Sequence, residues 1–99
     1  MLDELKSTDF SPYLGQTFHV SFESQSLLSA ELIEVTELSS GRGESDQRRS
    51  FSLVFRGPKT PVLRQRIYEI EHQEMGALGL FLVPIGPDEE GMRYEAVFT

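Results

Sequence analysis

His72 and Glu74 are the residues whose types and spacing best suit acid–base chemistry. A histidine can act as a general base when a carboxylate orients its ring and a cleft admits a substrate. Side chains two residues apart on a strand lie on one face, so the pair could meet, and Tyr68 could add a polar group. A structural interpretation competes, in which His72 ends a strand and hydrogen-bonds the backbone of the following turn.

His19 is the other candidate ligand or base, on the polar face of an expected strand at 16–22. A metal site would need further ligands close by, and Glu23 and Glu31 are the obvious ones. A solvated histidine explains the same pattern more simply. We therefore expect no metal and no cofactor.

Other catalytic patterns are missing from the sequence. Cysteine is absent, which excludes a thiol nucleophile and thiolate metal sites. The glycines form neither a G-x-x-x-x-G-K nor a G-x-G-x-x-G pattern, and no G-x-S-x-G occurs. The sequence predicts no catalytic residue and favours a non-enzymatic role.

The segment 77–85 is apolar on both faces, which is unusual for a strand of a small sheet with one wet side. Phe81, Val83 and Ile85 would form its outer face. They could meet a protein partner or a second copy as an exposed patch. Alternatively, the N-terminal apolar residues could fold over this face; these are Leu2, Leu5, Phe10, Tyr13 and Leu14.

Alternating apolar residues predict further strands at 50–56 and 92–98, while residues 1–15 form a lead-in with one short helical turn. The stretch 27–38 fits a helical stripe or a strand whose inward face switches at a bulge, and we predict the bulged strand. The stretch 62–72 has helix-capping residues, but its charges oppose the helix dipole. We predict a strand that begins near Arg66.

Together these elements predict a mainly β fold, a small antiparallel six-stranded barrel or sandwich with one short N-terminal helix. The alternative is an α+β fold with a helix at 27–38 or 62–74. Residues 1–99 form one domain, because no linker or internal repeat divides the chain. The polar stretch 39–49 reads as a mobile loop.

The net charge of −7 disfavours nucleic acid and anionic membranes as partners, because both are bound through clustered basic residues. The N-terminus lacks the features of a signal peptide, and no apolar run is long enough to span a bilayer. A cytoplasmic location is the resulting expectation.

The run Phe51-Ser-Leu-Val-Phe-Arg-Gly-Pro58 introduces a wider pattern, continued by Gln65, Tyr68, His72, Phe81-Leu-Val-Pro84 and Tyr94-Glu-Ala-Val-Phe98. With these residues the chain resembles an uncharacterised bacterial family of about 100 residues, a domain of unknown function. The resemblance implies no catalytic or binding residue. It implies an association with phage-tail-like or tail-fibre-like proteins, near whose genes members of the family occur.

These observations favour a non-enzymatic protein-interaction or structural accessory module, of a phage-tail-like or other multiprotein assembly. Its partner would be another protein or a second copy of the chain. The alternative is a small ligand-binding barrel or enzyme that uses His72, Tyr68 and nearby carboxylates. A deep polar pocket around His72 would favour the alternative, and a filled interior would disfavour it.

Overall fold

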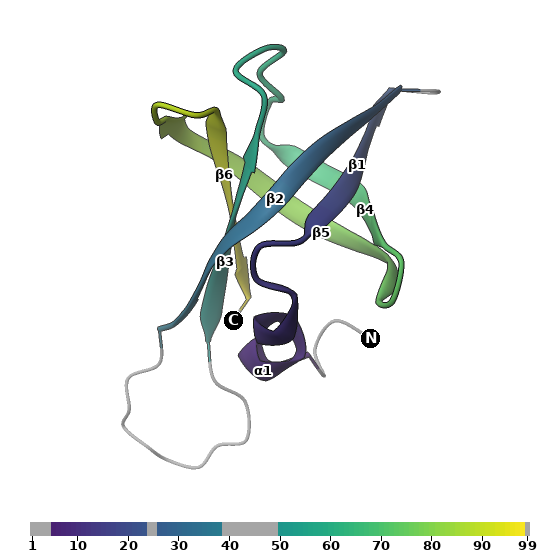
Figure 1. Ribbon diagram of the computed structural model, residues 1–99, viewed down its shortest axis with the longest axis vertical. Coiled ribbons are helices and arrows are strands. Elements are labelled where there is room, and N and C mark those ends of the chain that lie inside the picture. Colours follow the sequence, from purple (N-terminus) through teal and green to yellow (C-terminus); the bar gives the residue numbers. More distant parts are fainter. Residues whose placement is uncertain (1–4, 24–25, 39–49, 99) are drawn as a thin grey trace.

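Six antiparallel strands close into a barrel in the computed structural model, which describes residues 5–23, 26–38 and 50–98 (Figure 1). The elements are α1 (Ser7–Phe10), a 3₁₀ turn η2 (Ser11–Tyr13), β1 (Thr17–Glu23), β2 (Ser26–Glu37), β3 (Phe51–Gly57), β4 (Arg66–His72), β5 (Gly76–Pro87) and β6 (Met92–Phe98). Neighbouring strands follow the order β1-β2-β3-β6-β5-β4, and β1 pairs with β4 to close the ring. The predicted mainly β fold is confirmed in its barrel form. The loop predicted at 39–49 lies outside the described residues.

The bulged strand predicted at 27–38 is confirmed as β2. Leu28, Ala30 and Leu32 are buried, and the register shifts between Leu32 and Glu34. The extra residue, Ile33, lets the first half of the strand pair with β1 and the second half with β3. A helix here would have left these pairings unmade, and that alternative is wrong.

The strand predicted to begin near Arg66 is confirmed as β4. Tyr68, Ile70 and His72 are buried, whereas Glu69 and Glu71 between them are exposed. This period of two is what a strand with one wet face requires, and a helix would have mixed the two sets. The alternative helix at 62–74 is therefore wrong.

The pairing scheme divides the barrel into two three-stranded units that are related by an approximate two-fold axis. Each unit has a 12-residue middle strand between two 7-residue strands. Each residue of β1 and β2 corresponds to the residue 50 positions later in β4 and β5. The pair Thr17↔Glu31, for example, corresponds to the pair Ile67↔Phe81. Adding 41 relates β3 to β6, which meet across the axis at Val54↔Glu95. Corresponding positions can therefore be compared between the units.

Side chains fill the interior of the barrel. A barrel with so few strands encloses only enough room for its own side chains, and aromatic rings take up much of it here. Phe51 and Phe98 stack with their ring centroids 4.4 Å apart, and Phe18 meets Phe55 edge-on at 5.3 Å. The other buried core residues are Phe10, Val20, Leu28, Ala30, Leu32, Leu53, Leu63, Tyr68, Ile70, Leu80, Leu82, Met92, Tyr94 and Ala96.

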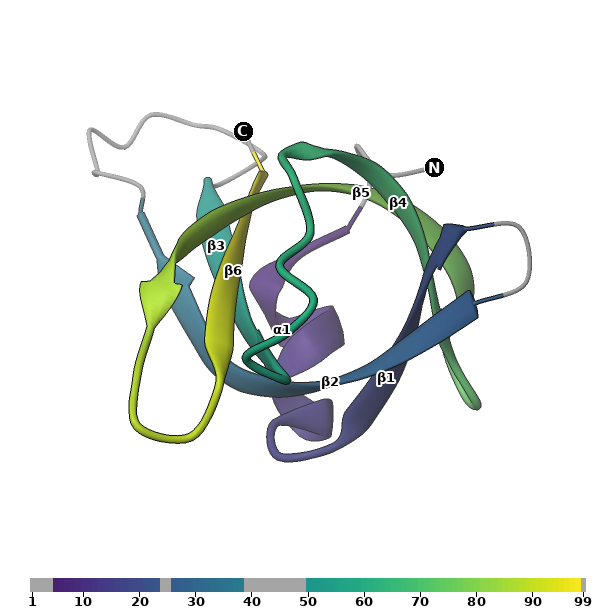
Figure 2. The same ribbon diagram turned by 90° about the horizontal axis from the view of Figure 1, so that it is seen from above.

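Each end of the barrel is closed by the segment that precedes one of the two units. Phe10 of α1 is fully buried, with its ring 5.9 Å from Phe51 and 5.6 Å from Phe98. At the other end the connection from β3 to β4 crosses the barrel mouth, and α1 lies beyond it in Figure 2. Leu63 of this connection is buried, and its backbone N–H donates to Tyr94 Oη over 2.9 Å. Each of these two segments thus adds a buried apolar side chain to its end of the core.

Two hydrogen bonds fix the short helix α1 in place. The Lys6 N–H donates to Asp9 Oδ2 over 2.8 Å within the first turn. Ser7 Oγ donates to Glu37 Oε2 over 2.6 Å, which ties the helix to the end of β2. No helix in the described ranges is long and apolar enough to cross a membrane.

Replacement of Phe10 by alanine tests the role of α1 in closing the core. We expect Phe10→Ala to lower the free energy of unfolding by about 3–5 kcal/mol, because it leaves a cavity against two aromatic rings. Equilibrium unfolding in urea measures the loss. Leu14→Ala is the matched control, since Leu14 is 46% exposed and should change stability by less than about 1 kcal/mol. Equal effects of the two variants would contradict the assigned role of Phe10.

Candidate functional site

His72 is 5% exposed and has a hydrogen-bond partner at both ring nitrogens. Its Nδ1 accepts from the backbone N–H groups of Glu74 and Met75, at 3.0 and 3.4 Å. Nδ1 must therefore carry the lone pair, and Nε2 carries the proton and donates to Gln16 Oε1 over 2.8 Å. The ring also lies against two aromatic rings, with centroids 4.5 Å from Tyr13 and 4.6 Å from Phe18.

The predicted polar set of His72, Tyr68 and Glu74 does not gather around one reaction centre. Tyr68 lies four residues before His72 on β4, about 13 Å away at the usual rise per residue, with Ile70 between them. The Tyr68 hydroxyl donates to the Arg64 carbonyl over 2.6 Å, and its ring lies under the Arg66 guanidinium at 5.6 Å. Glu74 is exposed in the turn after β4.

Glu74 instead affects Tyr13, whose ring packs on that of His72. Partial desolvation raises the pKa of the Tyr13 phenol, and the nearby Glu74 carboxylate raises it further. This effect keeps Tyr13 neutral at physiological pH, as an unperturbed tyrosine already is. The contact supports packing and supplies no acid or base.

A groove of about 650 Å³ lies outside His72, between the start of β1 and the β4–β5 turn. Its lining consists of Gly15, Gln16, Thr17, His19, Glu71, His72, Gln73 and Gly76. His19 and Glu71 face each other across the β1–β4 pairing, and both are exposed. Among the described residues, no three His, Cys, Asp or Glu side chains lie close enough together to hold a metal ion.

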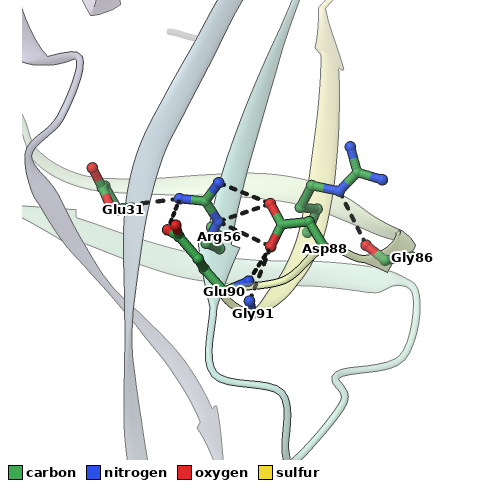
Figure 3. Close-up of polar contacts among 7 residues, drawn as sticks. Glu31, Arg56, Gly86, Asp88, Glu90 and Gly91 are labelled. Carbon is green, nitrogen blue, oxygen red and sulfur yellow. Dashed lines mark hydrogen bonds and ion pairs between the residues drawn. The ribbon is translucent and has the colours of Figure 1, made fainter.

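Arg56, near the end of β3, is the centre of a network of polar contacts (Figure 3). Its Nη2 and Nε donate to Asp88 Oδ2 over 2.8 and 3.0 Å. Its Nη1 lies 3.3 Å from Glu90 Oε1 and 4.0 Å from Glu31 Oε1. The guanidinium is thus surrounded by carboxylates of the same chain, and it joins β2 and β3 to the β5–β6 turn.

Asp88 shapes this turn as well as binding Arg56. Its Oδ1 accepts from the backbone N–H groups of Glu90 and Gly91, at 2.8 and 3.0 Å. The hydrogen bond from Arg56, followed by the bond from the Glu90 N–H, lowers the pKa of the Asp88 carboxyl to about 2. Gly91 allows the close approach, because a Cβ there would collide with the Gly57 carbonyl oxygen. The network is structural in every contact it makes.

The outer face of β5 is apolar, and no side chain in the described part of the chain covers it. Phe81 is 49% and Ile85 38% exposed, and Val83 is half-buried. The N-terminal residues from Leu5 onward do not cover this face: Leu5 packs against the core, Phe10 closes the barrel end, Tyr13 packs on His72, and Leu14 is itself exposed. Leu2, which was also expected to fold over this face, lies outside the described residues.

Two further exposed residues extend this apolar face, and sequence reasoning did not find them. Ile67 on β4 is 67% exposed and pairs in register with Phe81. Val97 on β6 is 51% exposed, two residues after Glu95, the partner of Val83. Alternation within each strand could have marked both as outward-facing, but only the register shows that they extend one face. We call Ile67, Phe81 and Val97 the apolar row.

The chain belongs to the family described as domain of unknown function DUF6916, whose model matches residues 5–98. The match extends from the start of the described chain to the last residue of β6. The resemblance drawn from the sequence to an uncharacterised domain of about 100 residues is thereby confirmed. Neither a curated protein nor a solved structure matches the chain significantly.

The hydrogen bonds of His72 predict that its loss affects stability. We expect His72→Ala to lower the free energy of unfolding by about 2–4 kcal/mol, because two turn N–H groups lose their acceptor and two rings lose a packing partner. His19→Ala is the matched control and should cost less than about 0.5 kcal/mol, since His19 is exposed. Thermal unfolding of both variants measures these losses of stability. A His72→Ala variant as stable as the control would contradict this account.

The lowered pKa of Asp88 predicts a pH dependence of folding. The folded pKa of about 2 lies below the ordinary 3.8, so the ionised carboxylate favours the fold. The resulting stability is present above about pH 4 and is lost as the pH falls through 2. We expect Asp88→Asn to remove this part of the acid sensitivity in urea unfolding at pH 2–6. Glu89→Gln, on the same turn, should retain it, and identical pH profiles for wild type and Asp88→Asn would refute the assignment.

Proposed function

We propose that this chain is a non-enzymatic protein-interaction or structural accessory module of a multiprotein assembly of the phage-tail-like kind, and that it works in the cytoplasm. The observation that carries the proposal is the contrast between a filled interior and an uncovered apolar outer face. Phe81 and Ile85 remain exposed although the core beneath them is closed. Exposed contiguous apolar surface is typical of interaction sites.

The filled interior supports a function on the outside of the barrel. Ligand-binding barrels hold their ligand in a lumen with a few polar groups directed into it. Here aromatic and aliphatic side chains occupy the lumen, with Phe10 and Leu63 at its ends. In the described part of the chain, every buried side-chain nitrogen and oxygen already has a hydrogen-bond partner. No polar group is left over inside to orient a ligand.

The geometry of His72 also favours this proposal over an enzyme that uses His72. A general base needs a free lone pair within reach of its substrate. The lone pair of His72 is on Nδ1, which is turned toward the backbone of its own turn. Its proton on Nε2 is committed to Gln16. The resemblance to a family found near phage-tail-like genes is the support for the kind of assembly.

The products of neighbouring genes provide the test. We expect the tagged wild-type chain to retain at least one of them in a pull-down, and Phe81→Ser to weaken that retention at least about fivefold. Leu27→Ser is the matched control, because Leu27 is 60% exposed on β2, in the other unit of the barrel.

Two outcomes would count against the proposal. If none of the neighbouring products is retained, the assembly role loses its basis. If Phe81→Ser and Leu27→Ser retain a product as well as wild type does, the interaction does not use this face.

A further inference from the structure

Because of the approximate two-fold axis, the apolar row of the second unit can be compared with the corresponding residues of the first unit. Ile67 and Phe81 correspond to Thr17 and Glu31 of the first unit, at a separation of 50 residues. Val97 corresponds to Arg56 at a separation of 41. In the first unit this row is polar, with Thr17 opposite Glu31, and Glu31 opposite Arg56.

The comparison shows that the barrel does not need apolar residues at these positions. The first unit closes its part of the same barrel with a threonine, a glutamate and an arginine there. Glu31 and Arg56 even approach each other to 4.0 Å. The apolar row is thus a feature of the second unit beyond the requirements of the fold.

The glycine next to the row leaves space beside its side chains. Gly79 lies next to Phe81 on the outer face of β5, and a Cβ there would meet only Ile67 Cγ2, at 3.7 Å. The absent side chain leaves a flat area beside Phe81 and Ile67. Ile67 is 67% exposed, so its contact with β5 covers only part of it.

Charges beside the row indicate the kind of partner. The next outward residues on the flanking strands are Glu69 on β4 and Glu95 on β6. Within the described ranges neither carboxylate has an ion-pair partner. The nearby arginines are engaged elsewhere, Arg66 over the Tyr68 ring and Arg93 with the Gly86 carbonyl. Free carboxylates beside apolar side chains complement a surface of opposite charge.

A second copy of the chain fits this face poorly. Each copy carries a net charge of −7, and a symmetric contact would bring like carboxylates together. The apolar row consists of three partly exposed side chains, whereas a stable interface buries about 800 Å² on each partner. A small basic segment satisfies both constraints better than a dimer does.

We propose that the apolar row binds a short extended segment of a partner protein in which one or two apolar side chains and lysine or arginine occupy every second position and therefore share one face. The apolar side chains pack on Ile67, Phe81 and Val97, and the basic groups reach Glu69 and Glu95. This inference rests on the proposed interaction function and specifies the chemistry of the partner.

The probe is a synthetic heptapeptide, Lys-Ser-Leu-Ser-Leu-Ser-Lys, whose lysines and leucines lie on one face when the peptide is extended. We expect it to shift the amide resonances of β4, β5 and β6 around the row when it is titrated into the full chain. Phe81→Ser and the double variant Glu69→Gln, Glu95→Gln should each weaken binding at least about fivefold. Leu27→Ser should bind as wild type does. Binding should also weaken as salt is raised, because exposed charges are screened.

Each control identifies a different failure. Equal binding of a lysine–serine peptide would show that charge alone suffices, and equal binding of a glutamate–leucine peptide would show that charge is irrelevant; either overturns the inference. Shifts elsewhere, or none, overturn it as well. Light scattering that shows a dimer lost in Phe81→Ser would assign the face to a second copy. If retention of the neighbouring gene products in the pull-down depends on Phe81 but not on Glu69 and Glu95, the proposed function stands and only this inference fails.

Discussion

The fold depends on filling the small lumen of a six-stranded barrel with side chains from both units. The stacked pair Phe51 and Phe98 joins β3 to β6 at the point where the two units meet. Phe10 packs on this pair and closes one end of the barrel. Leu63 closes the other end, where its backbone N–H donates a hydrogen bond to the Tyr94 hydroxyl. Large apolar side chains of the described residues therefore occupy the lumen between these two ends.

Symmetry separates what the fold requires from what it permits. Both units use a long middle strand that pairs on one side with its first half and on the other with its second half. Inward positions are apolar in both units because both line one core. Outward positions are free to differ, and they do: an ion pair of Glu31 and Arg56 in one unit, Phe81 and Val97 in the other. The second unit carries the surface that a partner could recognise.

Much of the fold could be predicted from the sequence, because alternation within a strand is a local signal. The face switch in β2 and the start of β4 at Arg66 both followed from residues a few positions apart. Contacts between distant residues could not be predicted in the same way. Arg56 meets Asp88 across 32 residues, and only the closed barrel brings the turn to the end of β3. The apolar face was predicted on β5 alone, since its extension to Ile67 and Val97 depends on register.

We expect the barrel to fold without the apolar row, because the first unit has polar residues at the corresponding positions. The most direct test places the polar row of the first unit onto the second, as the triple variant Ile67→Thr, Phe81→Glu, Val97→Arg. Equilibrium unfolding in urea should give a free energy of unfolding within about 1 kcal/mol of wild type, as expected for exposed positions. A loss of several kcal/mol, or failure to fold, would show that the row belongs to the packing of the barrel and would contradict the account.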